Sequence, residues 1–133
     1  MKDTVDQELI DIGDLDVEAF NEFATEQGWS DGMPLYVPTE EKVAKFVDRV
    51  RGDNRPFPPV PPRQIIPTLQ SLAANAVMAG CKPEYFPAVT AAMRGVLDPE
   101  YNLHGTLATT HSCAPMVMIS GPARLELGVN CGS

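Results

Sequence analysis

Apolar residues recur at the spacing of an amphipathic helix in three stretches of the chain. The first follows Thr39, a residue type that caps helix N-termini, and ends before Gly52; its apolar face is Val43, Phe46, Val47 and Val50. The second runs from Pro67 to Ala79, with Leu69, Leu72, Ala73, Ala76 and Val77 facing inward. The third runs from Pro83 to about Leu97, with Phe86, Val89, Met93, Val96 and Leu97 facing inward. A shorter helix is predicted from Asp16 to about Gln27.

One stretch near the C-terminus predicts a different element. Ala114 to Ser120 is a short, continuous apolar run bounded by turn-forming residues, which is typical of a buried strand. Gly121 and Pro122 then predict a turn into a brief helix from Ala123 to Leu127. The threonines after Gly105 argue against helix between the two histidines. The predicted fold class is therefore α/β mixed (α+β), with three amphipathic helices and a buried strand-turn-helix unit.

Charge is distributed unevenly along the 133 residues. Residues 1–31 carry ten acidic side chains against Lys2 alone, whereas the rest is close to neutral, and the whole chain has a net charge of -8. We expect residues 1–15 to form an acidic, flexible arm and residues 16–133 to form one domain that is incomplete at its C-terminus. The arm either solvates the protein or docks on a basic partner. Nothing in this pattern resembles the basic footprint of a nucleic-acid-binding protein.

Cellular location follows from what the sequence lacks. No apolar run approaches the roughly 18 residues of a membrane helix, and the acidic N-terminus is unlike a secretory signal. The three cysteines are widely spaced and odd in number, which is unlike a disulfide framework. We expect a cytoplasmic protein with reduced thiols and no membrane partner.

Candidate chemistry gathers in the charge-free stretch from Tyr101 to Ala123, which contains both histidines and Cys113. The residues predict a site on the loops around 102–111 and 121–130. His104 and His111 are either structural or act as acid/base groups; a metal-assisted hydrolase stays a further alternative, although no carboxylate lies between them in sequence. Cys81 precedes a predicted helix start, where the dipole would favour a thiolate, so a Cys–His pair is possible. No phosphate loop, nucleophile elbow or zinc spacing is complete, and the cofactor is unknown.

Three blocks carry a resemblance to a known family: GWSDGMPLYVPTEEKV, NAVMAGCKPEYFPAV and NLHGTLATTHSCAPMVMISGPARLELGVNCGS. Together they resemble a largely uncharacterised bacterial family whose genes often lie beside those of UGSC-motif selenoproteins and their cysteine forms. Family members are longer, so the resemblance implies that this chain is a truncated fragment, one piece of a cleaved protein or one subunit of a split version. They often lack Cys at the positions of Cys113 and Cys131. The positions that fit the pattern best are Asp31, Asn75, Cys81, Glu84, Tyr85, His104, Thr110, His111 and Asn130.

Two functions follow as hypotheses. In the first, the chain is a subunit or fragment of a cytoplasmic enzyme that acts on a small molecule with His/Cys chemistry. His104, His111 and Cys81 would be its catalytic groups, and Asp31, Asn75, Glu84, Tyr85, Thr110, Asn130 and Cys131 would bind substrate. In the second, the chain is a non-catalytic partner that binds and stabilises a redox or selenoprotein-type enzyme. We expect a second polypeptide as partner, either the C-terminal portion of the protein or a separate subunit.

Overall fold

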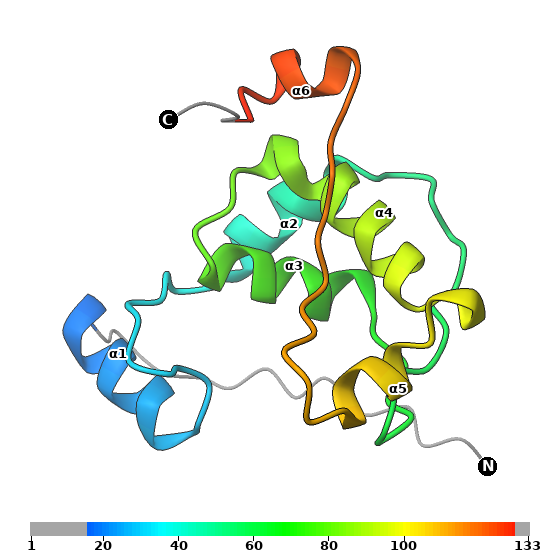
Figure 1. The fold of residues 1–133 in the computed structure, drawn as a ribbon. Coiled ribbons are helices and arrows are strands. Elements are labelled where there is room, and N and C mark those ends of the chain that lie inside the picture. The colour runs from blue at the N-terminus through cyan, green and yellow to red at the C-terminus, as the bar shows by residue number, and fades with distance from the viewer. Residues whose placement is uncertain (1–15, 130–133) are drawn as a thin grey trace.

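A computed structural model of the chain describes residues 16–129 (Figure 1). This part of the chain is helical, with short 3-10 turns (η1 and η2) before the fourth and fifth helices. In order, the elements are α1 Val17–Glu26, α2 Glu40–Asp48, α3 Leu69–Met78, η1 Pro83–Tyr85, α4 Phe86–Val96, η2 Pro99–Tyr101, α5 Leu103–Ala108 and α6 Pro122–Glu126.

The core lies where α2, α3 and α4 meet. Its centre is Phe86 at the start of α4, which is fully buried and meets Phe46 of α2 edge-to-face with ring centroids 5.7 Å apart. The small residues Ala73 and Ala76 of α3 are buried beside them and let the other helices come close. The three apolar stripes read from the sequence therefore pack against one another, and each predicted helix is confirmed within a few residues.

Capping residues explain where these helices begin. The side chains of Asp16 and Thr39 accept hydrogen bonds from backbone N–H groups in the first turns of α1 and α2. Thr68 forms a reciprocal capping box with Ser71 at the start of α3. At its other end, α3 stops at Gly80, where φ is +74° and an added Cβ would lie 3.0 Å from the Tyr36 ring. Helix limits are thus set by local chemistry that the sequence displays.

The proline-rich connector between α2 and α3 lacks regular secondary structure, as its composition predicts. Phe57 from this connector is buried, and an antiparallel bridge between Val60 and Ile65 closes a tight turn. The connector thus packs on the helices, and its first residues contact α4.

The predicted α/β mixed fold class is wrong. Residues 114–120 are extended, but they form no ladder with any other described residue, and the buried strand-turn-helix unit is absent from residues 16–129. Met116 and Met118 are 81% and 79% exposed, so the run is not buried either. The backbone there is drawn out, as Figure 1 shows, but the predicted strand is absent. A strand also needs a neighbour to take its backbone hydrogen bonds, and periodicity along one segment does not show whether such a neighbour exists.

The short helix α5 also contradicts the sequence reading, which expected no helix at Gly105. Asn102 has a left-handed backbone (φ +54°), and its side-chain oxygen accepts a hydrogen bond from the Gly105 N–H at 3.3 Å. A Cβ on residue 105 would lie 2.5 Å from the Asn102 amide nitrogen, so a larger residue there would force the capping side chain to shift. The cap fixes α5 despite its poor helix propensity, and it places His104 in the first turn.

Replacing Phe86 by alanine tests the core. We expect Phe86→Ala to lower the free energy of unfolding by about 3–5 kcal/mol, because the side chain is fully buried and its removal leaves a cavity beside Phe46. Urea unfolding followed by circular dichroism measures the loss. Leu125→Ala is the control, since Leu125 is 72% exposed. Equal stability of the two variants would contradict the proposed centre of the core.

Candidate functional site

Two of the predicted site residues line one apolar hollow. Cys81 follows α3 and Tyr85 ends η1, and Val117 and Ile119 of the extended segment face them across a volume of about 290 Å³. Cys81 is half-buried and also packs against the α2–α3–α4 core. Apart from the thiol and the phenol, the hollow is lined by aliphatic side chains. Its chemistry suits an apolar occupant more than a charged one.

His104 lines a different hollow, of about 220 Å³, next to residues 59–64 of the proline-rich connector. The polar residues around it are Gln64, Asp98 and Asn102, and the walls include Pro59 and Pro61. Gln64 and Asn102 both have left-handed backbones, with φ of +59° and +54°. Strain of this kind is often concentrated at functional sites, but here turn and cap geometry account for both. His104 is exposed, and Cys81 does not line this hollow.

His111 follows α5 and is exposed. Its ring Nδ1 lies 3.3 Å from the Thr109 hydroxyl, and its backbone N–H donates to the same hydroxyl at 3.2 Å. The Cys113 N–H donates to the His111 carbonyl at 2.8 Å, and the Cys113 side chain is exposed. Cys81 and His104 thus line two different hollows, and His111 lines neither of them.

The predicted substrate-binding residues are also dispersed. Asp31 accepts a hydrogen bond from the Met33 N–H in the turn after α1, and Asn75 donates to the Ser71 carbonyl along α3. Glu84 forms an ion pair with Arg49, and Thr110 is exposed next to His111. Asn130 and Cys131 lie outside the described residues. Most of these side chains thus have local structural partners.

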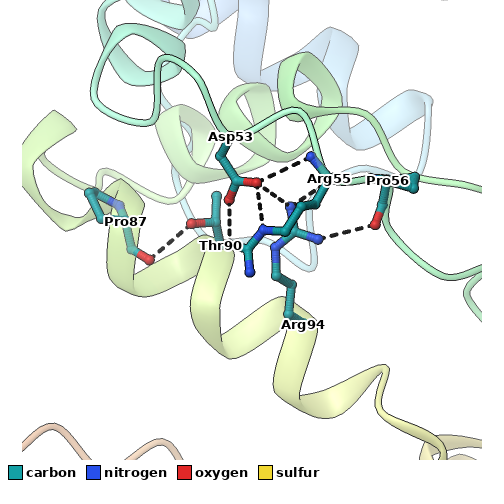
Figure 2. A network of polar contacts seen from close by, with 6 residues as sticks. All are labelled: Asp53, Arg55, Pro56, Pro87, Thr90 and Arg94. Carbon is teal, nitrogen blue, oxygen red and sulfur yellow. Dashed lines mark hydrogen bonds and ion pairs between the residues drawn. The ribbon is translucent and has the colours of Figure 1, made fainter.

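A polar network that the sequence did not predict joins the start of the proline-rich connector to α4 (Figure 2). Asp53 accepts two hydrogen bonds of 2.8 Å from the Arg55 guanidinium, which binds both carboxylate oxygens. Arg94 donates to Asp53 at 3.2 Å and to the carbonyl oxygens of Arg55 and Pro56 at 2.8 and 3.1 Å. Its guanidinium carbon also lies 4.2 Å from the centroid of the Phe57 ring. Arg94 therefore fastens the connector to α4.

The electrostatics of the network favour the ionised carboxylate. The hydrogen bonds and charge of Arg55, with a smaller contribution from the charge of Arg94, hold the pKa of Asp53 well below its ordinary value of 3.8. The same pairing raises the pKa of Arg55. Nε of Arg94 is buried without a hydrogen-bond partner among the described residues, while its Nη atoms hold the connector. One signal in the sequence pointed here: Arg94 is the single charged residue of α4.

The extended segment, residues 114–120, is the remaining feature that packing within the described residues does not explain. It runs between α5 and α6 across the front of the helices (Figure 1). Val117 and Ile119 line the apolar hollow, whereas Met116 and Met118 point to solvent. None of its backbone N–H or C=O groups forms a hydrogen bond with another described residue.

Comparisons with known proteins identify no relative. No protein-family model, no curated protein and no solved structure matches the chain. Between residues 16 and 129, no group of three or more His, Cys, Asp or Glu side chains is placed to hold a metal ion. In the same region, every helix is too short or too polar to cross a membrane.

Neutralising Asp53 tests the network. We expect Asp53→Asn to lower the melting temperature at pH 7, because Arg55 and Arg94 lose their shared charged acceptor. The pKa of Asp53 is lower in the folded chain than in the unfolded one. Its stabilisation is therefore complete above about pH 4 and is lost as the pH falls through the folded pKa.

Thermal melts of both proteins between pH 2.5 and pH 7 provide the measurement, and the difference in melting temperature should shrink toward low pH. Asp48→Asn is the matched control, since Asp48 pairs only with the exposed Arg51 and should change the melting temperature little. A difference that grows as the pH falls would contradict the role of Asp53.

Thiol reactivity distinguishes the two sequence hypotheses. In a Cys131→Ser background, we expect Cys113 to react with Ellman's reagent at neutral pH several-fold faster than Cys81, because Cys113 is exposed and Cys81 packs against the core. Denaturant should remove the difference. A folded protein in which Cys81 reacts as fast as Cys113 or faster would indicate an activated thiolate and would favour the enzyme hypothesis.

Proposed function

We propose that this chain is one subunit of a two-polypeptide assembly and that its extended segment, residues 114–120, is the strand to which the second polypeptide binds. The observation that carries the proposal is an extended, apolar run whose backbone groups are unpaired within the described residues. A drawn-out segment with unpaired backbone groups can pair with another chain, as the edge strand of a sheet does. The binding mode would be β-strand addition, in which main-chain hydrogen bonds supply much of the affinity.

The side chains support this assignment. Met116, Val117 and Met118 are 81%, 59% and 79% exposed, so three consecutive large apolar residues meet water. Contiguous apolar surface rimmed by polar residues is typical of protein-interaction sites. Because Val117 and Ile119 already line the hollow over α4, the helices hold the segment from one face. A partner strand is then free to pair along its edge.

The neutral character of this region defines the chemistry of the partner. From Tyr101 to Ala123 the chain has no charged side chain, so a paired strand gains from apolar residues and has no ion pairs to form there. Pro115 has no backbone N–H and therefore suits the start of the paired stretch. We infer a partner strand of about five residues rich in aliphatic side chains.

This proposal also accounts for the dispersed candidate catalytic groups. Cys81 and His104 line different hollows, His111 lines neither, and each of the three side chains is exposed or half-buried. A partner bound on residues 114–120 would cover the apolar hollow that contains Cys81 and Tyr85. If the assembly is an enzyme, its site is completed by groups from that partner. The family resemblance implies a redox or selenoprotein-type enzyme as the partner.

Substitution of Met118 tests the proposal. We expect the chain purified from its native source to carry a stoichiometric second polypeptide, and intact mass spectrometry measures the complex. Met118→Lys should weaken the complex by placing a charge against an apolar strand, and Met118→Pro should weaken it by removing a backbone donor. Met33→Lys is the matched control, because Met33 is 67% exposed on the turn after α1.

Hydrogen exchange locates the contact. Amides of residues 116–120 should exchange quickly in the isolated chain and slowly in the complex, whereas amides of α2 and α3 should change little. The proposal is wrong if the native protein is a solitary 14.4 kDa chain, or if the complex forms without protecting these amides.

A further inference from the structure

A third hollow, of about 310 Å³, lies beside the Asp53–Arg55–Arg94 network and is lined by three arginines. Arg51 and Arg55 come from the turn after α2, and Arg94 comes from α4. Asp53 is the single carboxylate on its walls. Even when Asp48, the partner of Arg51, is included, three guanidinium groups face two carboxylates. This local excess of positive charge stands out in a chain whose net charge is -8.

We propose that this hollow binds the phosphate group of a small molecule through the guanidinium groups of Arg51 and Arg55. Arginine presents planar, paired donors that match phosphate oxygens. Arg55 uses two of its five N–H groups on Asp53, and Arg51 uses one on Asp48. The rest are available, because the side chains of Arg51 and Arg55 are 80% and 73% exposed.

The network positions these donors in advance. Asp53 binds Arg55 through both oxygens and is itself bonded to Arg94, which is held by two connector carbonyls and the Phe57 ring. Arg94 is only 18% exposed, so it supports the site and does not serve as the main ligand contact. A guanidinium that is already oriented loses less conformational entropy when an anion binds.

The shape of the hollow favours a small phosphate ester. Besides the charged residues, its walls include Val50, Pro87 and Ala91, so apolar surface lies next to the guanidinium groups. A phosphate ester can place its anionic group on the arginines and its organic part on this surface. The Thr90 hydroxyl is not a donor to the anion, because it already donates to the Pro87 carbonyl at 2.9 Å.

Titration with methyl phosphate, with inorganic phosphate as a second probe, tests the proposal. Amide shifts in heteronuclear NMR spectra of the whole chain should saturate and should be largest for residues 50–55 and 87–94. Arg51→Gln is the primary variant, because Arg51 bonds only to Asp48 and its loss spares the network. We expect it to weaken binding about tenfold, the effect of one lost charge-assisted contact. Arg55→Gln should weaken binding at least as much.

Arg63→Gln is the matched control, since Arg63 is an exposed arginine of the proline-rich connector that does not line the hollow. Its affinity for methyl phosphate should equal that of the unchanged chain. The inference is overturned if shifts do not saturate, if Arg63→Gln weakens binding as much as Arg51→Gln, or if citrate binds and both phosphates do not. Unchanged amide spectra of the free variants verify that each remains folded.

Discussion

The contact between Phe86 and Phe46 is the interaction on which the rest of the described structure depends. It joins the start of α4 to the last turn of α2, and the buried alanines of α3 close the space around it. Once α4 is fixed there, Arg94 on its later turns reaches back to Asp53, Arg55 and Pro56 and holds the connector. The hollow of the arginines and the apolar hollow of Cys81 both use α4 as a wall. A single buried aromatic pair thus positions both surfaces from which we argue function.

Much of the helical structure could be predicted from the sequence because its causes are local. Stripes of apolar residues at helical spacing, N-caps at Asp16, Thr39 and Thr68, and a glycine stop at Gly80 are all visible in the sequence. The helix α5 was missed because its first turn is capped by Asn102, and the close approach of this side chain to residue 105 is not visible in the sequence. Helix propensities rate Gly105 and the threonines as unfavourable. In the structure, however, glycine at position 105 leaves room for the Asn102 side chain that caps the helix.

The candidate site was harder to predict, since it depends on contacts between distant residues. Arg94 and Asp53 are 41 positions apart, and nothing in either neighbourhood shows that they meet. The prediction from sequence instead favoured His104, His111 and Cys81, because their residue types are common in active sites. The fold places them around different hollows and turns. Arg94 could have been singled out as the one charge on an otherwise uncharged helix. A buried or half-buried charge implies a partner, and the search for that partner leads to Asp53.

The wrong strand prediction and the proposed assembly have one physical origin. A run such as Ala114–Ser120 has residues that favour extended backbone, and the structure gives it that backbone. Burial and pairing are properties of a neighbour, and residues 16–129 supply a neighbour for only one face, through Val117 and Ile119. Exposed methionines on the other side would be an aggregation hazard for a chain that works alone. A second polypeptide that covered this surface would bury the methionines and pair the free backbone groups. We therefore propose residues 114–120 as the part of the described chain that a partner would cover.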